Sequence, residues 1–136
     1  MPAWQAALTR ARGDRGSVSV IAAAIAFPVI IMLLSACFQA GFWFAARAAA
    51  LAAAQQGADT ARVAGASLRH GETAACAFAS SAAQGWLRDP ECTGTGGTTI
   101  AITVCGNALS LLPGLPVRAC AQARGARERF TTPGPP

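Results

Sequence analysis

An uninterrupted uncharged run limits what this chain can fold into. Between Arg15 and Arg47 the only ionisable group is the thiol of Cys37, and the core of the run, SVSVIAAAIAFPVIIMLLSACF, is apolar on every helical face. About 20 apolar residues cross a bilayer as a helix, and lipid offers the backbone no hydrogen-bond partner outside the segment. The run from Gly16 to Ala46 therefore predicts a transmembrane helix, kinked at Pro28.

The charges on either side predict its orientation. Three arginines crowd the residues before the run, whereas Arg47 on the far side is followed by no further cation until Arg62. An excess of arginine keeps a short tail in the cytoplasm. We therefore expect a single-pass protein of the cytoplasmic membrane, with a cytoplasmic tail at 1–15, an extracytoplasmic domain at 47–130 and a disordered end at 131–136.

Two helices are expected in and after the run. Alanine dominates the sequence after Arg47, which predicts that the first helix continues to about Leu68, with Gly71 just past its end. A second helix is expected from a Thr73 cap to about Leu87, before Asp89-Pro90. The predicted stripes are Leu51, Gln55, Ala58, Arg62 and Ala66 on the first helix, and Phe78, Ala82 and Trp86 on the second.

From Thr98 the apolar period changes to two, which is typical of half-buried strands. Ile100, Ile102 and Val104 alternate with smaller or polar residues, and a second alternating strand runs from Val117 to Arg124. The stretch TGTGG before them is expected to be a turn. The predicted fold class is α+β, with the long helix, a second short helix and a small antiparallel sheet.

Four cysteines lie in the extracytoplasmic part, and an even set in an oxidising compartment predicts two disulfides with three possible connectivities. If the two strands pair antiparallel, Cys105 and Cys120 come within disulfide range, which leaves Cys76 with Cys92. Zinc is the rival interpretation, but no pair has the C-x2-4-C spacing and His70 is the only histidine. We expect no metal and no cofactor.

The composition disfavours several function classes. The net charge is +5, with part of it in the N-terminal tail, so no nucleic-acid footprint stands out. There is no tyrosine, and the single histidine leaves little for acid–base chemistry. We therefore expect neither an enzyme nor a small-molecule substrate.

Several motifs together resemble the TadE family of bacterial pilus-assembly proteins. They are RGSVSV, AFPVIIMLL, FWFAARAAALAAAQQGADTAR, WLRDP, a TITV-like strand, LSLLPGLPV and the closing ERF, spread from about Arg15 to Phe130. The resemblance implies a pilin-like fold and a membrane-anchored pseudopilin that assists assembly of a tight-adherence (Flp-type) pilus or a related secretion apparatus. Its partners would be other pilin-like or Tad-type membrane subunits and the lipid bilayer.

The resemblance also implies residue roles near the start of the run. Cleavage after Gly16 would make Ser17 the new N-terminus, but Ile21 stands where prepilins of this type carry a glutamate. Small residues such as Ala22, Ala23, Ala24 and Ala26 allow close helix approach in lipid. We expect the face of Ala22, Ala23 and Ala26, together with Pro28, to pack in assembly.

Two alternatives share the same N-terminal features. Leu34-Ser35-Ala36-Cys37 fits a lipobox, so the chain is alternatively a lipoprotein cut before Cys37 and lipidated there. The apolar run is also compatible with a signal peptide whose removal would release a small disulfide-bonded secreted domain.

Overall fold

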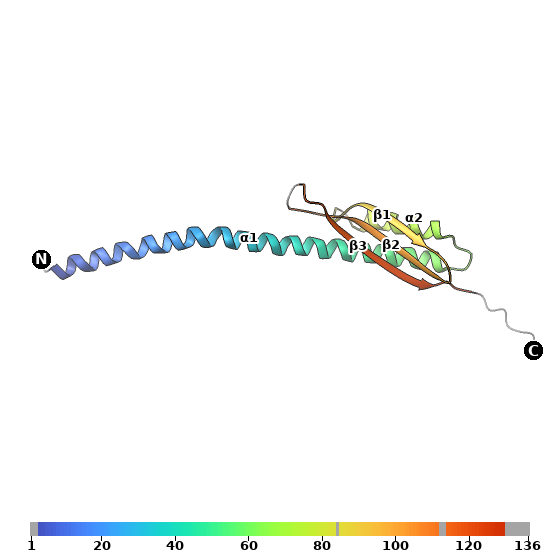
Figure 1. Cartoon of the computed structure of the whole chain (residues 1–136), viewed down its shortest axis with the longest axis horizontal. Helices are drawn as coiled ribbons and strands as arrows, with labels where there is room; N and C mark the ends of the chain where they lie inside the picture. Colours follow the sequence, from blue (N-terminus) through green and yellow to red (C-terminus); the bar gives the residue numbers. More distant parts are fainter. Residues whose placement is uncertain (1–2, 84, 112–113, 130–136) are drawn as a thin grey trace, which may run out of the picture. The chain divides into compact units, whose positions relative to one another are not determined.

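The computed structural model describes residues 3–83, 85–111 and 114–129, with side chains from residue 19 onward. The elements are α1 (Ala3–Arg62), α2 (Leu68–Ala82), β1 (Leu87–Thr95), β2 (Thr99–Ala108) and β3 (Val117–Ala126), as Figure 1 shows. The α+β class is confirmed, with one long N-terminal apolar helix, a short second helix and an antiparallel sheet. By packing, the chain divides into two units, Met1–Phe38 and Gln39–Pro136.

The sheet has the order β1-β2-β3, and both pairings are antiparallel. The predicted alternation of β2 is confirmed. Ile100, Ile102 and Val104 are buried, and the residues between them are half-buried. β3 is confirmed as well, and Cys105 lies directly opposite Cys120 in the register.

Strand β1 was not predicted, because its sequence contains signals that normally end an element. Asp89 and Pro90 lie inside it, at a register shift between Arg88 and Glu91, and Asp89 has a φ of 50°. Proline has no N–H to donate, so a bulge on an edge strand is where a sheet can hold it. The expected helix stop is therefore a strand bulge, and Thr93 to Thr95 are strand and not turn.

The boundary between the helices differs from the prediction. α1 ends at Arg62 and not near Leu68, and Gly65 follows with a φ of 86°, a conformation that favours glycine. Ser67, not Thr73, caps α2, since its hydroxyl accepts a hydrogen bond from the His70 N–H. Gly71, expected beyond a helix end, lies inside α2.

The end and the buried stripe of α2 also differ. The helix ends at Ala82, because Gly85 turns the chain with a φ of 94° into β1. Its buried residues are Gly71, Ala75 and Ala79, whereas Ala82 and Trp86 are exposed and Phe78 is half-buried against the core. The smallest side chains face inward because α1 packs there.

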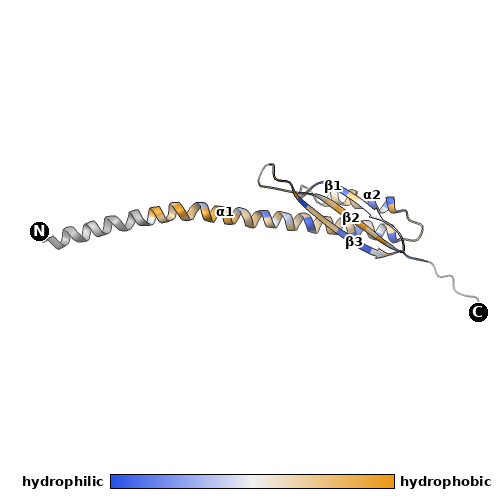
Figure 2. Cartoon of the chain, in the orientation of Figure 1, coloured by the Kyte–Doolittle hydropathy of each residue, from blue (hydrophilic) through white to orange (hydrophobic). Residues whose placement is uncertain are grey.

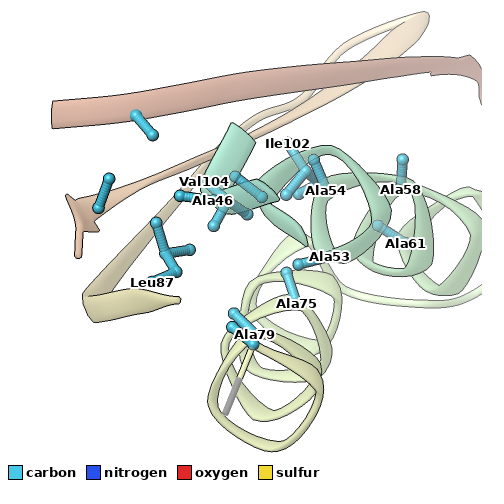
Figure 3. Close-up of a cluster of buried hydrophobic side chains, with 14 of the residues drawn as sticks. Ala46, Ala53, Ala54, Ala58, Ala61, Ala75, Ala79, Leu87, Ile102 and Val104 are labelled. Carbon is cyan, nitrogen blue, oxygen red and sulfur yellow. The ribbon is translucent and has the colours of Figure 1, made fainter. Parts of the chain in front are cut away.

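The matching stripe of α1 is made almost wholly of alanine, and the predicted stripe was wrong except at Ala58. Leu51, Gln55 and Arg62 are exposed. The buried positions are Ala46, Ala50, Ala53, Ala54, Gly57, Ala58 and Ala61. Figure 3 shows Ala75 and Ala79 of α2, and Ile102 and Val104 of β2, in one cluster with alanines of α1, of which Ala46, Ala53, Ala54, Ala58 and Ala61 are labelled. Large side chains come from the sheet, and small ones let the helices approach.

Both helices lie on the same face of the sheet. A Cβ on Gly57 of α1 would come within 3.2 Å of Cγ2 of Ile102, and the Trp43 indole N–H donates to the carbonyl oxygen of Arg118 in β3 at 3.3 Å. On α2, the Glu72 carboxylate accepts from the Gly94 N–H in β1 at 2.7 Å. The part of α1 from Gln39 onward therefore packs in the core of the second unit.

Candidate functional site

The candidate site is the apolar segment of α1, whose described side chains begin at Ser19. Every large apolar side chain from Val20 to Leu34 is exposed, and so is Phe38. Figure 2 shows this concentration of hydrophobic residues in the described part of α1. Among the described residues, α1 is the one helix long and apolar enough to span a membrane, judged by length and composition.

The segment is helical, so its backbone groups pair within the helix, except that Pro28 has no N–H to donate to the carbonyl oxygen of Ala24. The helix continues through Pro28, and the Ser35 hydroxyl donates to the carbonyl oxygen of Ile31 at 2.8 Å. A hydroxyl that bonds within its own helix needs no partner from the surroundings, as an apolar solvent requires.

The residues predicted to pack or to be processed lie on this same helix. Ala22, Ala23, Ala26 and Pro28 are exposed, so their side chains are accessible to a second helix. Cys37 is exposed and is not in a disulfide. Gly16 and Ser17 lie within α1, and their side chains are outside the described residues. These residues are close in the sequence and lie on one helix, so no tertiary contact is needed to bring them together.

The aromatic cluster Phe42, Trp43 and Phe44 belongs to the second unit. The Phe42 ring lies 5.6 Å from the Trp86 ring, and the Arg47 guanidinium lies 5.4 Å from the Trp43 ring centroid. Phe44 is exposed. Aromatic side chains therefore join the start of this unit to the turn before β1.

Two disulfides fix the second unit, and both join the pairs expected from the sequence. Cys105–Cys120 links β2 to β3 across one register pair with Cα atoms 4.1 Å apart. Cys76–Cys92 links α2 to β1 with Cα atoms 5.8 Å apart. Cys76 lies in the middle of α2 and Cys92 in the missed strand, so this bond joins helix to sheet.

Several polar side chains of the second unit have structural contacts. The Ser80 and Ser81 hydroxyls donate to the carbonyl oxygens of Cys76 and Phe78 within α2. Glu91 pairs with Arg118 across the exposed side of the sheet. In the part of the chain that the structure describes, no three His, Cys, Asp or Glu side chains converge as metal ligands would.

A shallow hollow of about 360 Å³ lies at the end of the sheet where β2 passes into β3. It is lined by Arg88, Asp89, Asn107, Ala108, Leu109, Ser110, Gly114, Leu115 and Pro116. The side chains around it are mixed in charge, with Arg88 and Asp89 both from the β1 bulge. Arg88 and Asp89 are the charged residues among those that line this hollow, and they do not form a recognisable catalytic or metal-binding group.

The sequence analysis missed the close contact between Gly57 and Gly71. Each is buried at the point where α1 passes α2, and a Cβ on either would lie 2.7 Å or less from the other's carbonyl oxygen. Two glycines in otherwise alanine-rich helical stretches were the available signal.

Comparison with known proteins assigns neither a family nor a function to this chain. No family model, curated protein or solved structure matches the chain.

Proposed function

We propose that this chain is a single-pass protein of the bacterial cytoplasmic membrane that assists, as a pseudopilin-like subunit, in assembling a tight-adherence (Flp-type) pilus or a related secretion apparatus. One observation carries the proposal. The helix α1 contains an exposed apolar segment, and its C-terminal part contributes to the core of a disulfide-linked α+β unit. An exposed apolar surface of this length needs lipid or other helices around it.

The proposed sidedness has two supports. The arginines before the apolar segment favour a cytoplasmic N-terminus. The two disulfides favour an oxidising compartment for the second unit, because thiols stay reduced in the cytoplasm. Both observations agree on an extracytoplasmic C-terminal unit.

The proposed work is association with similar subunits. Ala22 and Ala26 are one helical turn apart and share a face with Ala23, and all three are exposed. Small residues of this kind let helices approach closely where no hydrophobic effect drives them together. Other pilin-like membrane subunits are therefore the partners that we propose.

Fractionation and thiol counting test membrane attachment and sidedness together. The intact chain should stay with membranes after an alkaline carbonate wash, and a C-terminal epitope should be digested by protease added to spheroplasts. A maleimide reagent added after denaturation should modify only Cys37, because the other four cysteines are in disulfides. A chain that washes off, or that carries five free thiols in the cell, would contradict the proposal.

Assembly needs its own test in the host cell. Deleting the gene should abolish surface fibres or secretion through the apparatus, and the wild-type chain supplied in trans should restore them. A strain whose fibres and secretion are unchanged by the deletion would refute the assembly role and leave membrane attachment untouched.

A lipoprotein is the second candidate, and the division of the chain favours it specifically. Cleavage before Cys37 would leave the whole unit Gln39–Pro136 intact, with a free and exposed cysteine two residues ahead of it. Inhibiting the lipoprotein signal peptidase should then shift the chain to lower mobility. N-terminal sequencing separates the outcomes. The uncleaved chain keeps its original N-terminus, prepilin-type cleavage gives Ser17, lipoprotein processing gives Cys37, and signal-peptide removal gives a start near Ala46.

A further inference from the structure

Exposed apolar side chains gather at the end of the second unit where α1 enters it. The Gln39 side-chain oxygen accepts a hydrogen bond from the Leu111 N–H at 2.9 Å, which holds Leu111, in the connection between β2 and β3, against the start of this unit. The Leu109 N–H donates to the carbonyl oxygen of Trp86, whose ring contacts Phe42. These contacts bring the loop and the turn before β1 to the same end of the unit.

The side chains at this end are poorly covered by the chain itself. Trp86 is 43% exposed, Leu111 50% and Leu115 55%. The loop LSLLPGLP contains no charged residue. We call Trp86, Leu111 and Leu115 the apolar rim.

Arginines lie next to the apolar rim. Arg47 stacks on Trp43, the Trp43 indole is bonded to the Arg118 carbonyl oxygen, and Arg88 lines the hollow beside Leu115. All three arginine side chains are exposed. Exposed apolar side chains that include a tryptophan, with arginines next to them, suit the boundary between acyl chains and headgroups.

The length of the apolar segment sets the depth of this rim. From Gly16, the first residue after Arg15, to Phe38 the helix has 23 residues, which at 1.5 Å each span roughly 35 Å, enough to cross a hydrocarbon core of about 30 Å with some tilt. If this segment spans the bilayer, the boundary falls at Gln39. Because Leu111 is hydrogen-bonded to Gln39, the apolar rim lies at the same level.

We propose that the apolar rim inserts into the headgroup boundary of the outer leaflet, so that the second unit rests on the lipid surface as well as being tethered to it. The proposal rests on the proposed function, since it takes the apolar run up to Phe38 as the membrane span. We expect lipid to cover the apolar rim, because the rim adjoins the membrane span. Leu111 is hydrogen-bonded to Gln39, the residue that directly follows the span.

Tryptophan quenching in vesicles tests the proposal on the full chain. The chain is reconstituted in phosphatidylcholine and phosphatidylglycerol vesicles with lipids brominated at several acyl depths. Trp4→Phe with Trp43→Phe leaves Trp86 as the only tryptophan. Leu111→Trp, Leu51→Trp and Ile30→Trp are each made in a background that also carries Trp86→Phe. Leu51 is the matched control, an exposed leucine of the same unit, 12 residues and roughly 18 Å along the helix from Gln39.

Trp86 and Leu111→Trp should be blue-shifted and quenched by bromines about 5–10 Å below the headgroups, whereas Leu51→Trp should be quenched by aqueous iodide only. In a chain that retains Trp86, Leu111→Ser with Leu115→Ser should shift the Trp86 emission to the red and increase its quenching by iodide. Intact disulfides and an unchanged circular dichroism spectrum would show that the unit is still folded.

Failure of the inference can be distinguished from failure of the proposed function. If Ile30→Trp is quenched deep in the bilayer but Trp86 and Leu111→Trp behave like Leu51→Trp, the span holds and the lipid contact is refuted. If Trp86 is shielded from iodide only when the chain self-associates, and bromolipids do not quench it, the rim is a protein contact and the proposal is overturned. If Ile30→Trp is not quenched by any bromolipid, the membrane span fails and the rim proposal fails with it.

Discussion

Gly57 of α1 and Gly71 of α2 touch through their backbones. A Cβ added to Gly71 would lie 2.6 Å from the Gly57 carbonyl oxygen, and one added to Gly57 would lie 2.7 Å from the Gly71 carbonyl oxygen. No Cβ tolerates such distances, so the helices can pack this closely only with glycine at both positions. This contact sets how near α2 comes to α1 beneath the sheet.

Replacing Gly57 by alanine should therefore destabilise the second unit, although alanine favours helix. We expect a loss of about 2 kcal/mol or more in the free energy of unfolding, because the obstructing atoms are backbone and β-carbon. Urea unfolding of the detergent-solubilised chain measures it. Gly41→Ala is the matched control, since no atom lies within 4 Å of the added Cβ, and it should be neutral or stabilising by up to about 1 kcal/mol. Equal effects at both positions would contradict the close contact.

Truncation of Ile102 should be much more costly than truncation of an exposed leucine. Ile102 is fully buried at 0% exposure under α1, whereas Leu51 is 41% exposed. Ile102→Ala should cost about 2–5 kcal/mol of folding free energy, and Leu51→Ala less than about 0.5 kcal/mol. The same urea titration compares them. A large loss at Leu51 would mean that the stripe predicted from the sequence is the buried one after all.

Removing the Cys76–Cys92 bond should loosen one part of the unit selectively. We expect Cys76→Ala with Cys92→Ala to cost about 3 kcal/mol on the loop-entropy estimate. Because this bond joins α2 to an edge strand, amide hydrogen exchange should accelerate in α2 and β1 more than in β2 and β3. The comparison is the Cys105→Ala, Cys120→Ala pair, which should accelerate exchange in β3. Identical exchange maps for the two variants would contradict this division.

Asp89 holds an unusual backbone conformation that glycine should adopt more readily. Its φ of 50° lies in the left-handed region, where a Cβ costs about 1–2 kcal/mol for most residues. Asp89→Gly should leave the thermal stability unchanged or raise it. Asp89→Ala should destabilise the protein, reducing the free energy of unfolding by about 1 kcal/mol. Thermal unfolding followed by circular dichroism measures both. A more stable alanine variant would show that the bulge does not require this conformation.

The small-residue face of the apolar segment should control association in the membrane. Ala23→Leu should weaken self-association or pairing with a pilin-like partner in a membrane two-hybrid assay, because a larger side chain keeps helices apart. Ala24→Leu is the matched control, since at 100° per residue Ala24 points away from the face shared by Ala22 and Ala26. An unchanged signal for Ala23→Leu, or equal losses for both variants, would count against this face.

The sequence by itself determined the features that depend on local composition and period. The apolar segment follows from its uncharged length, and β2 and β3 follow from alternation of Ile100, Ile102 and Val104 and of the residues after Val117. The pairing of Cys105 with Cys120 also follows, because two alternating strands joined by a short loop have few registers that bury both apolar faces. The residues of the candidate site were found for the same reason, since they are consecutive on one helix.

Only the tertiary structure decided which alanines are buried, where the helices break and that Asp89-Pro90 belongs to a strand. Hydrophobicity hardly varies around α1, and the part of α1 in the second unit is mostly alanine, so the sequence identifies no inward face there. The inward face is set instead by how closely two backbones can approach, which depends on Gly57 meeting Gly71 from a distant part of the chain. β1 likewise exists because β2 offers it a partner, and pairing with a neighbouring strand outweighs the local tendency of Asp-Pro to end an element.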